Sequence, residues 1–302
     1  MRVFVTGGTG AIGGYAVPAL VRAGHIVSAL ARSDAKAEVL RNQGAIPVRA
    51  SLFDCDALAA AFENQDAVVN LASALPATTR FVFRSAWREC DHVRIEGSAT
   101  VVAAAQAADV PRLIQESVAM IYADGGHEWI DEDHPVDHYP IARGNHAAEA
   151  NARRFADAGG TATVLRFGVF YGHGAAHSEQ ILELAQHHIG FAAGRPDSYI
   201  SSIHLADAAD AVVAALTCPG ATYNVVDDQP VTKRDYAQAC ADAVGTKQWI
   251  TAPGRLGLLL GDRLTSLTRS LRVSNKRFRE TADWQPRYLS IREGYRAMTH
   301  FE

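Results

Sequence analysis

The sequence has few cysteines and no excess of positive charge, and each absence excludes a class of protein. Only four of its 302 residues are cysteine, and no two of them form a C-x-x-C pair. We therefore expect free thiols in a reducing compartment rather than a zinc site or a disulfide framework. The formal net charge is −4. A general nucleic-acid binder or a protein that binds anionic membranes needs a basic face, so neither partner is expected.

Long hydrophobic runs are also missing. The most apolar segment, Leu256–Leu260, is far shorter than the roughly eighteen residues that a membrane-spanning helix needs. The chain opens directly with the apolar run Val3–Val5, so no signal peptide is expected. A cytoplasmic protein is expected. A length of 302 residues with 48% hydrophobic residues suits one large α/β domain with a smaller appended lobe.

The first fourteen residues carry the most informative motif that is present. A short β-branched run, Val3–Val5, precedes glycines at positions 7, 10 and 13, and a helical pattern follows from Tyr15 to Ala23. One glycine permits the turn, one lets a pyrophosphate approach the backbone, and one lets the helix pack close to the strand. The helix N-terminus then offers free N–H groups and a partial positive charge to the phosphates. The motif predicts dinucleotide binding.

Strands alternate with helices along most of the chain, which predicts an α/β protein with a Rossmann-type doubly wound parallel sheet. The predicted further strands are residues 25–31, 45–50, 67–73, 112–115, 161–167 and 222–226. We expect residues 1–170, with 203–226 returning to them, to form the dinucleotide-binding domain. Residues 171–202 and 227–302 are expected to form a smaller, sequence-interleaved C-terminal substrate lobe.

Arg32 and Ser33 follow the second predicted strand, where a dinucleotide fold meets the adenosine ribose. An acidic residue there would bind the 2′-hydroxyl of NAD. A guanidinium and a hydroxyl suit a 2′-phosphate better, so NADP is the predicted cofactor, with NAD as the alternative. Nearby Asp34 opposes this preference, and Arg32 could instead be a solvated loop cation.

Other local patterns predict caps and one amphipathic face. Asp56 and Asp207 are placed to cap helices, and Thr232 starts a helix with Asp235 in the capping-box position. The leucines between Gly254 and Arg272 are spaced for one helical face, which could pack in the core, cover the substrate or join a homodimer. The acids and histidines between positions 124 and 137 are expected to be solvated loop residues rather than metal ligands.

Several segments together resemble the extended or atypical short-chain dehydrogenases/reductases of the NAD-dependent epimerase/dehydratase type. The segments that carry the resemblance are Thr6–Gly13, Asn70–Ser73, Glu116–Tyr122, Leu165–Gly172, Ile203–Asp207, Tyr223–Val225 and Trp284–Tyr288. Their order and spacing cover nearly the whole chain. The resemblance implies an NAD(P)-dependent oxidoreductase or epimerase that acts on a carbonyl or hydroxyl of a small molecule, with a nucleotide sugar as the family's usual substrate.

The resemblance also implies catalytic residues, and here the sequence departs from the family. Members use a Ser or Thr after the fifth strand together with a Tyr and a Lys four residues apart on the next helix. Ser117, Tyr139 and Arg143 are the matching residues, with Arg in place of Lys. Arg can lend charge and hydrogen bonds to the ribose, although its guanidinium is larger and does not deprotonate.

A second alignment removes both catalytic groups. Family members usually have a Glu four residues after the Lys, and Glu149 would place the Lys position at Asn145 and the Tyr position at Ile141. Measured back from Tyr122, the usual hydroxyl position falls on Val118, one residue after Ser117. The sequence therefore leaves two hypotheses open. Either Tyr139 is the acid/base of an active enzyme, or the site is relocated or degenerate. A site that has lost proton-transfer chemistry would leave a cofactor-binding sensor or scaffold.

The predicted cofactor contacts follow the carboxyl ends of the strands, where ligands of open parallel sheets bind. They are Gly7, Thr9, Gly10, Ala11, Ile12, Gly13, Arg32, Ser33, Ser51, Leu52, Leu71, Ala72, Ser73, Asn145, Phe167, Gly168 and Val169. Ser51 and Leu52 are expected beside the adenine, and the resemblance places Gly168 and Val169 beside the nicotinamide. The predicted partner is a small-molecule substrate.

Overall fold

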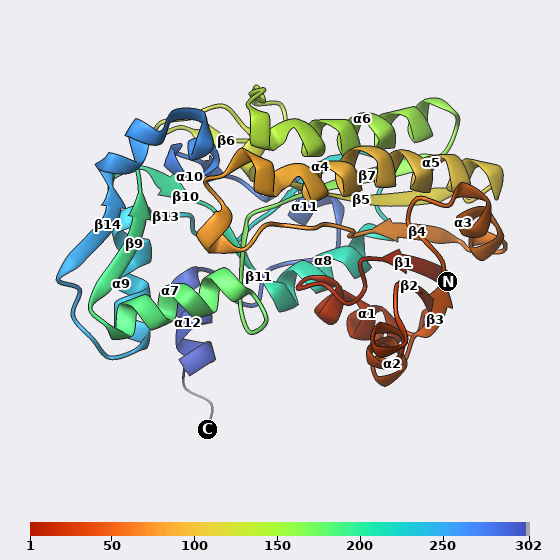
Figure 1. Ribbon diagram of the computed structural model, residues 1–302, viewed down its shortest axis with the longest axis horizontal. Coiled ribbons are helices and arrows are strands. Elements are labelled where there is room, and N and C mark those ends of the chain that lie inside the picture. Colours follow the sequence, from red (N-terminus) through yellow and green to blue (C-terminus); the bar gives the residue numbers. More distant parts are fainter. Residues whose placement is uncertain (300–302) are drawn as a thin grey trace.

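A seven-stranded parallel sheet with helices on both faces forms the larger part of the molecule (Figure 1). The computed structural model describes residues 1–299. The strand order is β12-β7-β5-β4-β1-β2-β3, which confirms the predicted Rossmann-type sheet. The strands are β1 (Arg2–Thr6), β2 (Ile26–Ala31), β3 (Ile46–Arg49), β4 (Ala67–Asn70), β5 (Arg112–Val118), β7 (Thr161–Phe167) and β12 (Thr222–Val225).

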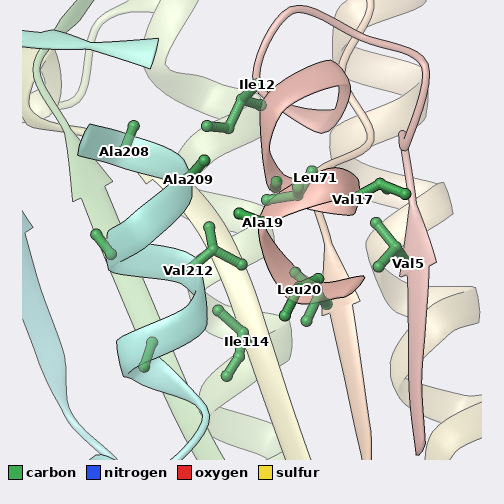
Figure 2. Packing of buried hydrophobic residues seen from close by; sticks show 14 of the residues in the cluster. Val5, Ile12, Val17, Ala19, Leu20, Leu71, Ile114, Ala208, Ala209 and Val212 are labelled. Atoms are coloured by element: carbon green, nitrogen blue, oxygen red, sulfur yellow. The ribbon is translucent and has the colours of Figure 1, made fainter. Parts of the chain in front are cut away.

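The two faces of the sheet are covered by different helices. On one face, α1 (Gly13–Arg22) packs against α8 (Leu205–Ala215). Figure 2 shows Leu20 and Val212 of these helices above Ile114 of β5. The other face carries α3 (Cys55–Phe62), α5 (Ser98–Ala107) and α6 (Arg143–Asp157), and α2 (Asp34–Asn42) follows β2. Because α8 and β12 come from beyond residue 200, the large layer is assembled from separate stretches of sequence.

Short strand pairs and several helices lie beside the large sheet, on the left of Figure 1, where the second lobe is predicted. α7 (Ala176–Gln186), α9 (Lys233–Ala243) and α12 (Ile291–Thr299) surround a core that contains Tyr236 and Tyr295. The short strands are β6 (Trp129–Ile130), β8 (Val169–Tyr171), β9 (Ile189–Ala193), β10 (Tyr199–Ile200), β11 (Ser202–His204), β13 (Val231–Thr232), β14 (Ile250–Gly254) and β15 (Arg272–Val273), and the remaining α-helices are α4 (Arg88–His92), α10 (Thr265–Thr268) and α11 (Lys276–Thr281).

Two predicted N-caps are wrong and one is confirmed. The carboxylate of Asp54, not that of Asp56, accepts the Ala57 N–H at the start of α3. His204 Nδ1 accepts the Ala206 N–H at the start of α8, while Asp207 lies inside the helix. In both cases α-helical backbone begins earlier than the apolar pattern indicates. The Thr232 hydroxyl accepts the Asp235 N–H at 3.2 Å, as predicted.

The leucine-rich segment does not form one amphipathic α-helix. Residues Arg255–Arg263 form η6, a 3-10 helix with non-helical backbone at Gly261, and the short α10 follows. Leu256 is 71% exposed, whereas Leu264 and Leu271 are buried. The break at Gly261 separates the exposed leucines from the buried ones, so the predicted common face does not exist. Within residues 1–299, no helix is both long enough and apolar enough to cross a bilayer.

Candidate active site

The loop between β1 and α1 has the shape that the three glycines predict. Gly7 has a φ of +71°, and a side chain at Gly7 would place its Cβ 2.4 Å from the Leu71 carbonyl oxygen. A Cβ at Gly13 would lie 2.2 Å from the Gly7 carbonyl oxygen. Gly7 thus makes the turn against the end of β4, and Gly13 lets α1 begin close to it. Gly10 is exposed, and no side chain caps α1. The helix N-terminus is left for an anion.

The predicted adenosine contacts lie beyond β2 and β3. Arg32 is exposed immediately after β2, and the Ser33 hydroxyl accepts the Lys36 N–H at the start of α2. Ser51 is exposed, while Leu52 is buried against Gly97. The Arg32 guanidinium is therefore accessible at the position where the sequence predicts the 2′-phosphate.

A buried polar chain fixes the ends of the three central strands. The Thr6 hydroxyl donates to Asn70 Oδ1 at 2.5 Å, and Asn70 Nδ2 donates to Gln115 Oε1 at 2.8 Å. Leu71 N–H donates to the Thr6 carbonyl oxygen. These contacts hold the carboxyl ends of β1, β4 and β5 at one level. They position Leu71, and the following Ala72 and Ser73, beside the glycine loop.

A buried ion pair lies at the same edge. Arg94, from the π-helical turn η3 (Val93–Gly97) between α4 and α5, donates from Nη2 to Glu116 Oε1 at 2.8 Å. Arg94 Nη2 is also 3.5 Å from the Ser73 hydroxyl. Both side chains of the pair are 5% exposed. The Arg94–Glu116 pair therefore bridges the ends of β4 and β5.

The Arg94–Glu116 pair leaves hydrogen-bonding atoms unused. Among residues 1–299, Glu116 Oε2, Arg94 Nε and Arg94 Nη1 are buried without an oxygen or nitrogen partner, and so is Asn145 Oδ1 on α6. The Cys90 thiol lies beside the Arg94 guanidinium. An unpaired buried polar group costs about 1–3 kcal/mol, and a charged one more. Burial raises the pKa of Glu116, and the Arg94 guanidinium opposes that rise. Glu116 is not among the predicted site residues, because the family motif places a hydroxyl, not a carboxylate, at the end of this strand.

Ser117 faces the opposite side of the sheet from Glu116. Its hydroxyl is fully buried and donates to Glu149 Oε1 at 2.7 Å. Arg166 donates to both oxygens of the same carboxylate, at 2.8 and 2.7 Å. Burial raises the pKa of Glu149, but the hydrogen bonds and charge of Arg166 outweigh it and lower the pKa. These contacts tie α6 to β5 and β7, so in this structure Ser117 has a structural partner.

Tyr139 is also engaged by the protein. It precedes the turn η5 (Pro140–Ala142), is 8% exposed, and donates its hydroxyl to the Met120 carbonyl oxygen at 2.7 Å. Burial raises the pKa of Tyr139, although Arg269 lies 4.8 Å above the ring and acts against the rise. Arg143 is exposed at the start of α6. The structure thus places Tyr139 and Arg143 in different environments, and their catalytic roles stay predictions.

The two lobes meet at a small cavity next to Tyr139. Its lining includes Ala119, Met120 and Val169 from the sheet side and Ser266, Leu267 and Arg269 from the second lobe. Gly168 N–H and Val169 N–H already donate to the carbonyl oxygens of Val225 and Ser201. Phe167 is buried in the main core. A substrate bound at this junction would contact groups of both lobes.

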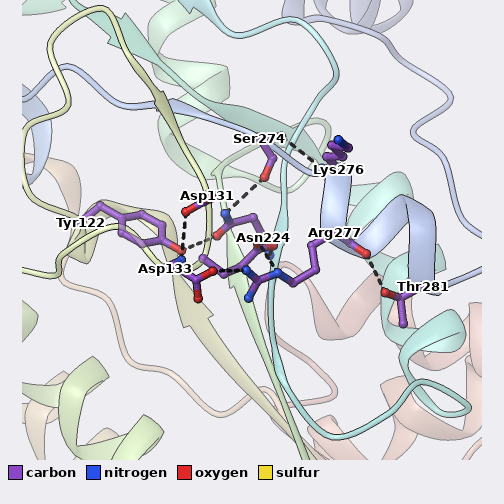
Figure 3. Close-up of polar contacts among 9 residues, drawn as sticks. Tyr122, Asp131, Asp133, Asn224, Ser274, Lys276, Arg277 and Thr281 are labelled. Atoms are coloured by element: carbon purple, nitrogen blue, oxygen red, sulfur yellow. Dashed lines mark hydrogen bonds and ion pairs between the residues drawn. The ribbon is translucent and has the colours of Figure 1, made fainter.

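Tyr122 joins β12 to the second lobe rather than facing this cavity. Its hydroxyl donates to Asn224 Oδ1 at 2.8 Å, and Asn224 Nδ2 donates to the Ser274 carbonyl oxygen (Figure 3). Arg277 pairs with Asp133 in the same network. Burial raises the pKa of Tyr122 to about 12. Within residues 1–299, no group of three or more His, Cys, Asp or Glu side chains could bind a metal ion.

Comparison with known proteins agrees with this geometry. A family model described as NAD(P)H-binding matches residues 7–219. The chain belongs to the NAD(P)-binding short-chain dehydrogenases/reductases. Within this family, a 3-diazoavenalumate denitrifying reductase from Streptomyces sp is 31% identical, covering 97% of this chain and 99% of the relative. A 4-hydroxy-2-methyl-3-oxo-4-farnesyl-3,4-dihydroquinoline-1-oxide ketoreductase from Stigmatella aurantiaca is 33% identical over 51% of this chain and 44% of its own length.

The fold is shared with solved epimerases of this family. The Thermus thermophilus UDP-glucose 4-epimerase complex with NAD superposes with a TM-score of 0.79 at 22% identity, covering 99% of this chain and 97% of the epimerase. This likeness shows the shared fold, and the NAD(P)H-binding family model supports a nicotinamide cofactor. The chain's own residues fit that cofactor, because the glycine turn offers an uncapped helix N-terminus and, among residues 1–299, Glu116, Arg94 and Asn145 have buried atoms without oxygen or nitrogen partners.

Proposed function

We propose that the protein is an NADP(H)-dependent reductase that transfers a hydride to an electrophilic small molecule. The proposal rests on the intact cofactor turn and on the alignment that places Ile141 and Asn145 at the Tyr and Lys positions. The buried contacts of Glu149 support this alignment. Glu149 is fixed by Ser117 and Arg166, and Asn145, four residues earlier, lies on the same side of α6.

The replacement bears on which substrates can react without a protein acid or base. Oxidising or epimerising an alcohol requires a base that takes the hydroxyl proton, and neither an isoleucine nor an amide can do so. Hydride transfer to a strong electrophile depends mainly on its position against the nicotinamide. The names of the two relatives, a reductase and a ketoreductase, also favour reduction. When bound, the cofactor supplies the hydride and this chain orients it. The proton that completes the reduction comes from solvent, since neither Ile141 nor Asn145 can donate one.

A second function is favoured by another observation. The hydroxyls of both predicted catalytic residues are committed to the protein, Ser117 to Glu149 and Tyr139 to Met120. A sensor or scaffold that binds NADP(H) without turnover would tolerate this arrangement. The two candidate functions differ in whether bound cofactor ever transfers its hydride.

Deuterium transfer distinguishes the two. The protein is incubated with NADPH carrying deuterium at C4, on either face, and with an aryl diazo compound, a ketone, a quinone and a nucleotide sugar. We expect deuterium in the reduced product of at least one electrophile, with matching formation of NADP⁺. Saturable NADPH binding without deuterium in any product would contradict the reductase and support the sensor. Epimerisation of the nucleotide sugar with bound NAD would contradict both.

A further inference from the structure

We propose that Glu116 and Arg94 form the site for the ribose hydroxyls of the cofactor's nicotinamide half. In this role they replace the lysine that family members use for the ribose. The inference rests on cofactor binding alone and does not require the reductase activity proposed above. Neither residue is part of the family's usual Tyr, Lys and Ser set.

The position of Glu116 follows from the register of the sheet. Thr6 of β1 pairs with Asn70 of β4, and Asn70 pairs with Gln115 of β5. Gly7, Leu71 and Glu116 therefore follow one another across three adjacent strand ends. Alternate side chains of a strand share a face, so Glu116 points to the same face as Ile114. Figure 2 places Ile114 on the side of α1 and α8.

This position is on the nicotinamide side of the glycine turn. The adenosine contacts lie beyond β2 and β3, on one side of β1, while β4 and β5 lie on the other. A dinucleotide whose pyrophosphate sits at the start of α1 must extend its second nucleoside over the ends of β4 and β5. Ser73 follows β4, and Glu116 lies at the end of β5. The Arg94 guanidinium contacts both residues.

The unused atoms of the pair match a ribose diol. Among residues 1–299, Glu116 Oε2 is a buried acceptor without a donor, and Arg94 Nε and Nη1 are buried donors without an oxygen or nitrogen acceptor. A ribose hydroxyl both donates and accepts. One hydroxyl could donate to the Glu116 carboxylate while it or its neighbour accepts from Arg94. Charge-assisted hydrogen bonds of this kind are stronger than neutral ones.

The first turn of α6 is shaped around the same pair. A Cβ at Gly144 would lie 3.0 Å from Arg94 Cβ and 3.2 Å from Arg94 Cδ. Gly144 thus lets α6 pack closely over the arginine, and the following Asn145 brings a further unpartnered oxygen, Oδ1. Because Asn145 stands at the Lys position of the family alignment, the ribose site keeps its location while its chemistry changes.

The inference is tested by comparing a ligand that contains the nicotinamide ribose with one that lacks it. Dissociation constants of NADPH and of adenosine 2′,5′-bisphosphate, which lacks the nicotinamide ribose, are measured for the native protein and for Glu116→Gln. NADPH is used because its dihydronicotinamide ring carries no charge. We expect NADPH to bind roughly ten- to a hundredfold more weakly to the variant, the effect of one lost charged hydrogen bond, with the bisphosphate unchanged. Equal NADPH affinity in both proteins would overturn the inference.

A third ligand separates the ribose from the carboxamide, whose amide could pair with the same two residues. The reduced 3-acetylpyridine analogue of NADPH keeps the ribose and lacks the amide N–H group. Glu116→Gln should weaken the binding of this analogue by the same factor as the binding of NADPH. If the variant binds the analogue as tightly as the native protein does, Glu116 contacts the carboxamide and the ribose site is wrong.

Two further variants control for folding, because Glu116→Gln leaves a buried arginine without its charged partner. Replacing both residues, Glu116→Leu with Arg94→Met, removes the two charges together and is expected to fold. The double variant should bind NADPH more weakly than the native protein and should keep the native affinity for adenosine 2′,5′-bisphosphate. Glu149→Gln removes a carboxylate paired with Arg166 on the opposite face, and it should leave the ratio of the two affinities unchanged. A drop in this ratio for Glu149→Gln, equal to that of Glu116→Gln, would contradict a specific ribose contact.

Discussion

The Tyr139 hydroxyl donates to the Met120 carbonyl oxygen at 2.7 Å, and Arg269 covers the other side of its ring. Tyr139 therefore contacts two separate parts of the molecule, because Met120 follows β5 and Arg269 follows α10. We predict that Tyr139→Phe costs about 1 kcal/mol of unfolding free energy, the value of one hydrogen bond. NADPH affinity and turnover of a substrate found by deuterium transfer should stay nearly unchanged.

Calorimetry and steady-state kinetics of this variant decide between the two hypotheses for Tyr139. A general acid contributes roughly 10²–10⁴-fold to the rate. A loss of that size in kcat, with an unchanged melting temperature, would identify Tyr139 as the acid and remove the main support for a relocated site.

Arg32→Ala should weaken the binding of NADPH about tenfold or more, because one charge-assisted contact to the 2′-phosphate is lost. The binding of NADH, which has no 2′-phosphate, should be unchanged. Arg22→Ala is the matched control. Arg22 is equally exposed but lies in the last turn of α1, at the other end of the strand-turn-helix unit. Fluorescence titration with both cofactors gives the ratio of the NADPH and NADH dissociation constants for each protein. Parallel weakening of NADPH and NADH by Arg32→Ala would refute the predicted preference for NADP.

The neighbouring Gly13 and Gly14 should respond to alanine with opposite signs. A Cβ at Gly13 would lie 2.2 Å from a backbone oxygen, whereas the nearest atom to a Cβ at Gly14 is a side-chain nitrogen at 4.0 Å. Gly13→Ala should cost on the order of 1–3 kcal/mol and weaken cofactor binding, since the loop must move. Gly14→Ala should stabilise the helix by roughly 0.5 kcal/mol. Chemical denaturation of both variants provides the test, and destabilisation by Gly14→Ala would contradict the described packing of α1.

Asp227→Asn should stabilise the protein at neutral pH. Asp227 is buried, and no cation among residues 1–299 forms an ion pair with it; the Tyr171 hydroxyl and the His204 backbone lie near its carboxylate. Burial, with the nearby charge of Asp207, raises the pKa of Asp227 well above its ordinary value of 3.8. Between the ordinary and the raised pKa, the folded state keeps a proton that the unfolded state has released, so stability falls as pH rises through this window.

Melting temperatures from acidic to neutral pH measure this effect, and the slope should flatten in Asp227→Asn. Asp228→Asn is the contrasting neighbour. Asp228 accepts from Arg279 at 2.7 Å and from Asn275 at 2.8 Å, so its substitution should lower the melting temperature. An unchanged pH slope in Asp227→Asn would show that Asp227 is not the titrating group.

The sequence predicts the sheet and the glycine turn well, because local chemistry determines both. Apolar β-branched runs mark the buried strands, and Gly7 and Gly13 stand where backbone approaches too closely for any other residue. The boundaries of β7 agree with the predicted strand 161–167. The end of β5 is less evident from the sequence, since the strand continues through Glu116 and Ser117.

The polar contacts of the site depend on tertiary packing, which no motif contains. Ser117 and Glu116 are adjacent in sequence, yet their side chains face opposite sides of the sheet. Sequence spacing shows that Ser117 is one residue away from the usual position without showing that Glu149 binds it. The partner of Glu116 is Arg94, which comes from a π-helical turn.

The return of β12 to the sheet has a consequence for protein engineering. Within residues 1–299, β12 pairs only with β7 and forms the outer strand of that edge. A fragment that ends after β7 would expose the backbone groups of Thr161–Phe167 as an open edge, where another chain could add and start aggregation. An exchange of substrate lobes with a relative must therefore use several junctions that leave β12 and α8 in place.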